Sequence, residues 1–172
     1  MILTTERRWL AMRGGRYTVG IVVMKPEEMA EATSIEFAPS DWLVVSQEMI
    51  DQFANCTDDH QAIHVDPKAA IGLGLDGTIA HGFLSLSLIP KLVADFRVLP
   101  ENTVMGMNYG FNKVRFLSPV PSGSRIRAHM RITNVERKTP SQFVMTHLVE
   151  IEIEGKQKPA LVAEWLNMLV TD

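Results

Sequence analysis

The densest group of chemically capable side chains in the 172-residue chain lies in residues 57–67, which read TDDHQAIHVDP. Nine of these residues include three carboxylates and two imidazoles: Asp58, Asp59, His60, His64 and Asp66. A carboxylate and an imidazole that hold one water can accept and return a proton near neutral pH, because the reference pKa of histidine is about 6.5. The segment therefore has the groups needed for general acid–base chemistry.

Residues of these types also have ordinary structural uses. Asp59 can cap a helix or turn while His64 hydrogen-bonds in the core, and Asp58 can be a solvated or loop-capping acid. His60 and His64 are four residues apart and could bind a metal on a helix, but no cysteine or distant ligand set supports that reading. We expect Cys56 to be a small buried hydrophobe rather than a nucleophile.

Two short helices are expected on either side of this segment. Ser46 is a good N-cap for an amphipathic helix over residues 46–55, whose apolar residues recur at helical spacing. Asp66 followed by Pro67 starts a second helical turn that reaches about residue 71, because Asp caps well and Pro suits the first helical position. The chemically rich segment is therefore a loop held by rigid elements, where functional sites tend to occur.

A third helix is expected over residues 82–96, with apolar residues on nearly every side, as in a buried helix. Pro90 inside it cannot donate to the carbonyl of Leu86, which predicts a bend near residues 87–90. After Val104 the pattern changes to strands over residues 112–116, 125–135, 142–154 and 160–170, with turns between them. The sequence thus predicts an α+β fold, with an antiparallel sheet around a central buried helix.

Composition excludes several classes of protein. Seventeen Lys and Arg against 20 Asp and Glu give a net charge of -3 and a pI near 6.0, so no nucleic-acid partner is expected. The single cysteine excludes an intrachain disulfide or a multi-thiolate metal site and fits a reducing compartment, with the cytoplasm as the default. The apolar run at residues 19–24 is too short for a signal-peptide core or a membrane span, so we expect no membrane association.

The length fits one domain, which we place at residues 24–172, after an N-terminal extension of unknown role at residues 1–23. Four arginines occur in residues 1–16 against Glu6 alone, and we interpret them as part of a solvated extension rather than a targeting segment. Met24 could also be the start of the chain, because the organised pattern begins only after Pro26.

Several motifs in order resemble those of the MaoC-like (R)-specific enoyl-CoA hydratases, and most closely their NodN-like branch. They comprise residues 40–54, residues 57–67, TIAHGFLSLSL at residues 78–88, NYGFNKVRF at residues 108–116, residues 118–121, residues 158–160 and residues 163–164. The resemblance spans about residues 38–170 and leaves residues 1–37 uncovered. It implies a hotdog fold, in which an antiparallel sheet wraps a long central helix, and a homodimer.

The resemblance also assigns roles. The catalytic aspartate of the family falls on Asp59, its amide residue on Gln61 and its catalytic histidine on His64. The glycine whose backbone N–H binds the thioester oxygen falls on Gly82, at the helix start, where the dipole favours developing negative charge. His81, just before it, is expected to orient that turn by hydrogen bonding rather than to act as a base.

Three positions depart from the family pattern. Asp58 stands where the family usually has Gly or another acidic residue, and Ala62 replaces a larger Pro or Trp. Pro90 stands where some members place a serine near the active site, so that role is absent or falls to another residue such as Ser87. Outside the motif, Lys113 and Arg115 are read as surface charges on a strand or as groups that hold CoA phosphates.

The activity implied by the resemblance is the reversible addition of water to a trans-2-enoyl-CoA, which gives a (3R)-3-hydroxyacyl-CoA in fatty acid metabolism without metal or redox cofactor. Three alternatives stay open from the sequence. One is a dehydratase that acts on acyl-carrier-protein thioesters, another is a hotdog thioesterase, and the third is a non-catalytic module that binds acyl thioesters.

Overall fold

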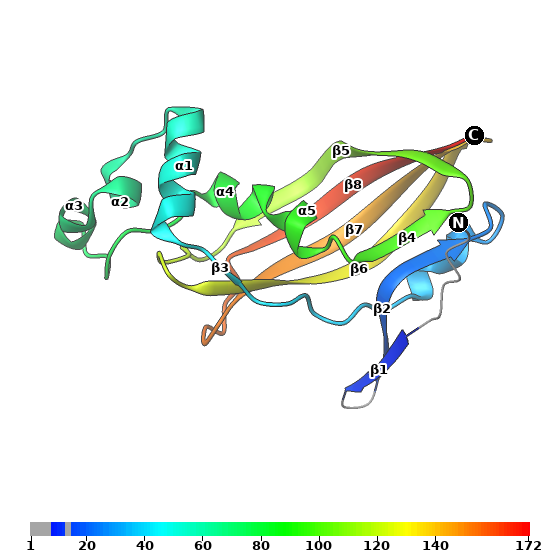
Figure 1. Cartoon of the computed structure of the whole chain (residues 1–172), viewed down its shortest axis with the longest axis horizontal. Coiled ribbons are helices and arrows are strands. Elements are labelled where there is room, and N and C mark those ends of the chain that lie inside the picture. The colour runs from blue at the N-terminus through cyan, green and yellow to red at the C-terminus, as the bar shows by residue number, and fades with distance from the viewer. Residues whose placement is uncertain (1–7, 13–14) are drawn as a thin grey trace.

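The structure is a computed structural model that describes residues 8–12 and 15–172. Its main element is a curled five-stranded antiparallel sheet with the order β3-β6-β7-β8-β5 (Figure 1). The strands are β3 (Leu43–Val44), β5 (Thr103–Phe116), β6 (Arg125–Thr139), β7 (Gln142–Ile153) and β8 (Leu161–Thr171). The helices lie against one face and one end of this sheet, which confirms the predicted α+β class.

Three short helices form the end of the molecule that carries the chemically rich segment. They are α1 (Gln47–Thr57), α2 (Ala62–Val65) and α3 (Pro67–Gly72). Ser46 caps α1 by accepting a hydrogen bond from the Met49 amide, and Asp66 caps α3 by accepting from the amides of Lys68 and Ala69. Both predicted helix starts are therefore confirmed.

The central helix is divided into α4 (Gly82–Ser87) and α5 (Ile89–Leu92), with the break at Leu88. The predicted bend at residues 87–90 is confirmed, because Pro90 removes an amide donor from the helical ladder. The predicted extension of the helix to Phe96 is wrong. Residues 96–100 form a strand instead, β4 (Phe96–Pro100).

Strand β5 begins nine residues earlier than residue 112, the start expected from the sequence. Its pairing with β8 shifts register between Thr103 and Met105, Asn108 and Gly110, and Phe111 and Lys113. Each irregularity interrupts the alternation of buried and exposed side chains by which a strand is recognised. The first part of β5 therefore has no clear period-two pattern in the sequence.

A second, three-stranded sheet joins the N-terminal part of the chain to β4. Its order is β1-β2-β4, with β1 (Arg8–Met12) antiparallel to β2 (Gly15–Met24) and β2 parallel to β4. A 3-10 helix, η1 (Met29–Ser34), follows β2. The extension placed at residues 1–23 lies partly outside the described residues, and the domain boundary at residue 24 stays a prediction. No helix within the described residues is long and apolar enough to cross a membrane.

His147 is a titratable group in the interior of the main sheet. It lies on β7 with 7% of its surface exposed, and its ring is 5.7 Å from that of Trp165. Burial lowers the pKa of His147 from 6.5 to about 4, against a smaller opposing effect of backbone groups of Trp165 and Met145. At neutral pH His147 is therefore an uncharged imidazole.

This ionisation predicts a specific loss of stability in acid. Between about pH 6.5 and pH 4 the unfolded chain binds a proton at His147 that the folded chain does not, so acidification in this window favours unfolding. The free energy of unfolding should fall by about 3 kcal/mol from this group alone. His147→Phe removes the titrating group, so urea denaturation should show the stability difference between wild type and variant changing by that amount across the window. Parallel pH profiles would contradict the assignment.

Candidate active site

Three side chains converge at the end of the molecule formed by α1 to α3. Asp59, His64 and His81 each place one carboxylate oxygen or ring nitrogen within 4.8 Å of the others. The rings of His64 and His81 are stacked with their centroids 3.7 Å apart, and both residues are buried. The two residues selected from the sequence, Asp59 and His64, are thus brought together, and His81 joins them.

The backbone at the end of α1 sets the position of Asp59. Asp58 adopts the left-handed conformation, with φ 57°, and ends the helix there. This conformation suits Gly best, and Asp tolerates it. Asp58 is fully exposed, so it is a loop-capping acid and not a second member of the cluster.

His81 ties the Asp59 loop to the start of α4. Its Nε2 donates to the backbone carbonyl of Asp59 at 2.9 Å, across 22 residues of sequence. The ring also packs 5.1 Å from that of Phe53, and its buried Nδ1 has no hydrogen-bond partner in the described part of the chain. The predicted role of His81 as a residue that orients by hydrogen bonding is therefore consistent with this contact.

The orientation of His64 is set by one strong contact. Its Nδ1 lies 2.7 Å from the backbone carbonyl of Ile79, which can only accept, so Nδ1 carries the hydrogen. In the neutral ring Nε2 is then the nitrogen with a free lone pair. His64 is accordingly prepared to accept a proton at Nε2.

Side-chain contacts from α1 hold the short helix that carries His64. Gln47 Nε2 donates to the backbone carbonyl of His64 at 2.8 Å, and Thr78 Oγ1 donates to Gln47 Oε1 at 2.5 Å. The Ile79 amide donates to the Ile63 carbonyl at 3.0 Å. The segments around residues 47, 64 and 79 are therefore linked in one hydrogen-bonded unit.

A cavity of about 280 Å³ opens beside His64 at the start of α4. Gly82, Ser85 and Phe116 are among its lining residues. The first amides of a helix have no partner within the helix, and no hydrogen bond among the described residues uses the Gly82 N–H. A Cβ at Gly82 would lie 3.1 Å from the Phe116 ring, so the absence of a side chain keeps this corner open.

Asp59 and the other residues predicted to contribute are not among those that line this cavity. Gln61 is exposed at the N-cap of α2, where its backbone carbonyl accepts from the His64 amide. His60 is exposed and lies 3.0 Å from Asn55 Oδ1, away from the cluster. Ser87 is also exposed and donates to the Phe83 carbonyl of its own helix. Ser87 is therefore not placed to replace the serine that Pro90 displaces.

The expectation that Cys56 is buried is wrong. The buried residues of α1 are Ile50 and Ala54, which are one turn apart, and Cys56 lies two positions beyond Ala54 on the solvent side. Lys113 and Arg115 are exposed on β5, in the half of the strand that ends at Phe116. Their position fits both interpretations, as surface charges or as groups that hold CoA phosphates.

The cluster also has the residue types of a metal site, since two imidazoles and a carboxylate can bind a divalent cation. Each histidine already uses one ring nitrogen on a backbone carbonyl, which leaves His64 Nε2, His81 Nδ1 and the Asp59 carboxylate. His60, the partner considered from sequence spacing, is not among them. A metal-free site stays a prediction.

The contacts of three residues were missed from the sequence. Ser85 is 3% exposed and lies one helical turn after Gly82, so the i, i+3 spacing could have placed it on the cavity side. His81 reaches Asp59, and Phe116 reaches Gly82, through contacts between distant segments. No local pattern in the sequence predicts those two contacts.

Comparison with known proteins identifies the family of this chain. Residues 28–153 match the MaoC like domain family. Nodulation protein N of Rhizobium leguminosarum bv. viciae is 43% identical over 140 residues, which are 80% of this chain and 86% of that protein. The 3-hydroxyacyl-thioester dehydratase Z of Mycobacterium tuberculosis (strain ATCC 25618 / H37Rv) is 42% identical over 137 residues, which are 80% of this chain and 90% of that protein.

Among solved structures, the (R)-hydratase from A. caviae superposes with a TM-score of 0.59 at 21% identity, covering 76% of this chain and 91% of that one. This likeness confirms the hotdog fold. The fold and the matched family together define a lyase of the hydratase/dehydratase type. The chain belongs to the MaoC-like family.

The packing of Phe116 on Gly82 predicts a steric effect with a built-in rescue. Gly82→Ala places a methyl group 3.1 Å from the ring of Phe116, which is 47% exposed and must shift away from it. Hydratase kcat/KM should fall about tenfold, because a small displacement of reacting groups has a large effect on rate. Phe116→Leu in the same chain should restore part of the loss. Equal activity of Gly82→Ala and wild type would exclude this corner from the site.

Proposed function

We propose that the protein is an (R)-specific enoyl-CoA hydratase that reversibly adds water to a trans-2-enoyl-CoA to give a (3R)-3-hydroxyacyl-CoA. The observation that carries the proposal is the convergence of Asp59 with His64, which lines a cavity together with Gly82. The (3R) outcome and the CoA thioester come from the family resemblance.

In the proposed reaction one water lies between the Asp59 carboxylate and His64 Nε2. The water oxygen bonds to the β-carbon of the enoyl group as its proton passes to this pair, and the α-carbon receives a proton in turn. Negative charge builds on the thioester oxygen, where the Gly82 N–H donates a hydrogen bond. Atoms and electrons balance without a redox cofactor, and we expect no metal.

Carboxylate and imidazole act on the same water, so neither residue is the sole base. Gln61 is proposed to contact the thioester from the rim, which would require its exposed side chain to turn toward the cavity on binding. Buried Ser85 gives this cavity wall a hydroxyl, which takes the place of the serine expected near Pro90.

The second candidate is the reverse reaction on a carrier-protein thioester, in the direction that removes water. It is favoured by the 42% identity to a protein named as a 3-hydroxyacyl-thioester dehydratase. Exposed Lys113 and Arg115 could contact either the phosphates of CoA or an acidic carrier protein. Rates on CoA and carrier-protein thioesters with the same acyl chain separate the two. We place the reaction in the cytoplasm, in keeping with a single exposed cysteine.

Substitution of the pair should abolish most turnover while the fold is retained. Asp59→Asn and His64→Ala each remove one of the groups that hold the water, so kcat should fall by roughly 10² to 10⁴. The assay is loss of the conjugated enoyl thioester, with protein dialysed against a chelator and chiral analysis of the product.

The matched control is Asp58→Asn, an exposed neighbour at a left-handed position that Asn also tolerates. It should keep near-wild-type turnover. If both site variants also keep it, or if activity is lost with the metal, the proposed mechanism is wrong.

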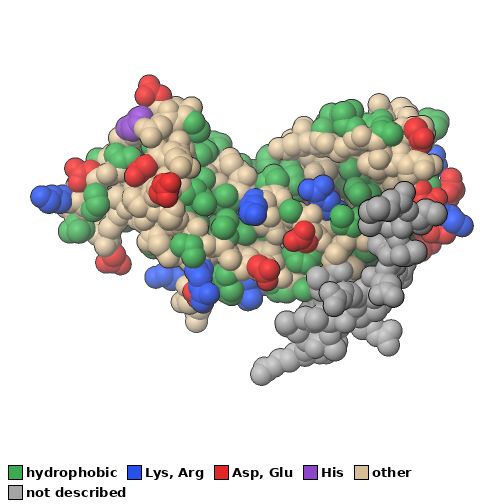
Figure 2. All heavy atoms as spheres, viewed as in Figure 1, with side chains coloured by type: hydrophobic (Ala, Val, Ile, Leu, Met, Phe, Trp, Pro, Cys, Tyr) green, Lys and Arg blue, Asp and Glu red, His purple; other side chains and the backbone are tan. Residues whose placement is uncertain are grey.

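The homodimer expected from the family is supported by the exposed edge of the main sheet. Strand β5 ends the strand order, and among the described residues it pairs only with β8. Large exposed hydrophobic side chains occur along it and on α4: Phe83, Val104, Met105, Met107, Tyr109 and Phe116. Hydrophobic side chains also gather in the hollow of the surface near α4, α5 and β5 (Figure 2). An apolar unpaired edge is a template for a second strand, and a twofold dimer pairs β5 with β5.

Charge placed at the middle of β5 should dissociate this dimer. Tyr109→Glu puts two carboxylates close to the twofold axis, where like charges opposite one another are unfavourable. Light scattering during size exclusion should give the mass of a dimer for wild type and of a monomer for the variant. Asn134→Glu, on the exposed part of β6, is the control and should remain dimeric. A dimeric Tyr109→Glu would place the contact elsewhere.

A further inference from the structure

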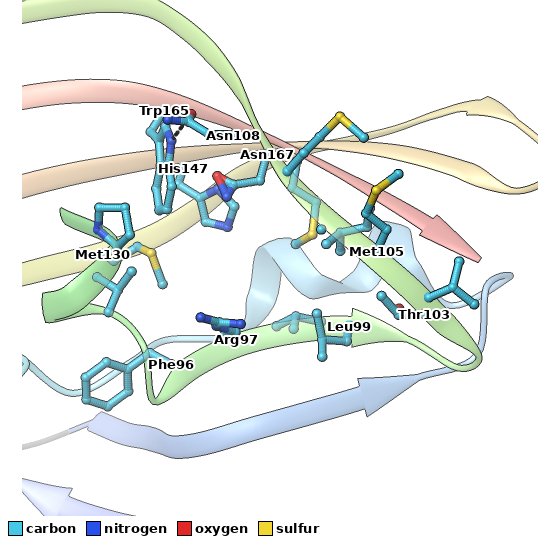
Figure 3. A pocket seen from close by; sticks show the side chains of 18 residues that line it. Phe96, Arg97, Leu99, Thr103, Met105, Asn108, Met130, His147, Trp165 and Asn167 are labelled. Atoms are coloured by element: carbon cyan, nitrogen blue, oxygen red, sulfur yellow. Dashed lines mark hydrogen bonds between the residues drawn. The ribbon is translucent and has the colours of Figure 1, made fainter. Parts of the chain in front are cut away.

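A second cavity, of about 350 Å³, lies at the other end of the main sheet from the Asp59–His64 pair. Its floor is the sheet face that carries His147, Trp165 and Asn167, and its opposite wall includes Phe96, Arg97 and Leu99 of β4 (Figure 3). Residues 103–108 of β5 close one side. Asn108 is eight residues from Phe116 along β5, about 26 Å at about 3.3 Å per residue, so this is not the catalytic cavity of the same chain.

Two polar groups in this cavity lack partners. His147 Nδ1 and Asn167 Oδ1 are buried and form no hydrogen bond of normal geometry with a described residue, although backbone groups of Trp165 and Met145 lie near the His147 ring. His147 faces Trp165 and Met145 faces Asn167 in the pairing of β7 with β8, so all four side chains share one sheet face. The neighbouring Trp165 Nε1 donates to Asn108 Oδ1 at 2.7 Å, so this pair is satisfied. Buried polar atoms are rarely left unpaired in proteins, which indicates that a ligand or solvent group completes them.

The surroundings of His147 favour an uncharged group. Burial lowers the pKa of His147 to about 4, so the imidazole offers no positive charge at neutral pH. Met105, Met130 and Met145 make much of the rest of the lining apolar. Arg97 is a cation in the lining, but its residue is exposed, on β4 across from the sheet (Figure 3). A carboxylate beside His147 would lose its hydration without gaining a buried charge partner.

We propose that this cavity binds an aliphatic group that carries a hydroxyl, with the hydroxyl placed at His147 and Asn167. A hydroxyl both donates and accepts, so it can accept a hydrogen bond from the His147 Nδ1–H and donate one to Asn167 Oδ1 at the same time. The methionines and Leu99, Val98 and Leu169 contact the aliphatic part.

An aliphatic group with a hydroxyl can come from two sources. One is a free aliphatic alcohol, and the other is the distal end of an acyl chain held by its thioester, which makes the substrate a hydroxylated acyl thioester. The second source rests on the proposed function. It also requires the β5-to-β5 dimer, in which antiparallel strands bring the Thr103 end of one copy toward the Phe116 end of the other.

Binding is tested on the full chain with three probes of equal length: 1-hexanol, 1-fluorohexane and hexanoate. The imidazole ¹⁵N resonances of His147 report hydrogen bonding at the ring, which a change in packing alone would not produce. We expect 1-hexanol to bind about tenfold more tightly than 1-fluorohexane, as one or two net hydrogen bonds would give, and to shift the ¹⁵N resonances. Hexanoate should bind more weakly than 1-hexanol.

Two variants and a control localise the effect. His147→Phe and Asn167→Leu should each reduce the preference for 1-hexanol over 1-fluorohexane to about threefold or less. Glu150→Gln, exposed on the same strand as His147, should leave it unchanged. The preference of the wild-type protein for 1-hexanol over 1-fluorohexane tests the proposal even if a variant does not fold. The proposal is overturned by equal binding of the alcohol and the fluoride, by tightest binding of hexanoate, or by no saturable binding, which would leave water as the occupant.

Kinetics then distinguish the sources. A higher kcat/KM for an enoyl-CoA with a terminal hydroxyl than for its methyl-terminated match, lost in His147→Phe, supports the acyl source. An unchanged ratio with retained alcohol binding supports a free alcohol. If no enoyl-CoA is turned over while alcohol binding persists, the proposed function is wrong, and the cavity is still supported as a site that binds a hydroxyl group.

Discussion

The hydrogen bond from His64 Nδ1 to the Ile79 carbonyl is the contact on which the proposed active-site chemistry depends. It fixes the tautomer, so that Nε2 is the basic nitrogen, and it joins the helix carrying His64 to the segment that leads into Gly82. Without it the ring could rotate, and an imidazole with the wrong nitrogen protonated cannot accept a proton from water at this position. Gln47 and Thr78 matter because they hold the two sides of that contact at a constant distance.

The parts of the fold that could be predicted from sequence are those with local causes. The caps at Ser46 and Asp66 and the break caused by Pro90 each depend on residues a few positions apart. Strand β4 and the length of β5 could not be predicted in the same way. Strand β4 exists because it pairs with β2, about 75 residues earlier, and β5 loses its alternation at three irregularities.

The same distinction applies to the site. Asp59 and His64 belong to one short motif, so the sequence could place them near each other. The bond between His81 and the Asp59 carbonyl depends on the packing of α4 against the loop after α1, and the exposure of Cys56 depends on which face of α1 is buried. The left-handed backbone of Asp58 ends α1, and only a few residue types, Gly and Asp among them, adopt this conformation readily.

Strand β5 has a charged half and an apolar half, and each half ends at a different cavity. Its Phe116 end lines the proposed catalytic cavity and carries Lys113 and Arg115. Its Thr103 end lines the second cavity and carries Val104, Met105 and Met107. A parallel, in-register pair of such strands would set Lys113 against Lys113. An antiparallel pair about the middle sets the charged half of each strand against the apolar half of the other, which avoids like-charge contacts and covers the exposed methionines. The distribution of charge along this edge therefore favours antiparallel pairing. The same pairing brings the cavity beside His64 of one copy toward the cavity beside His147 of the other.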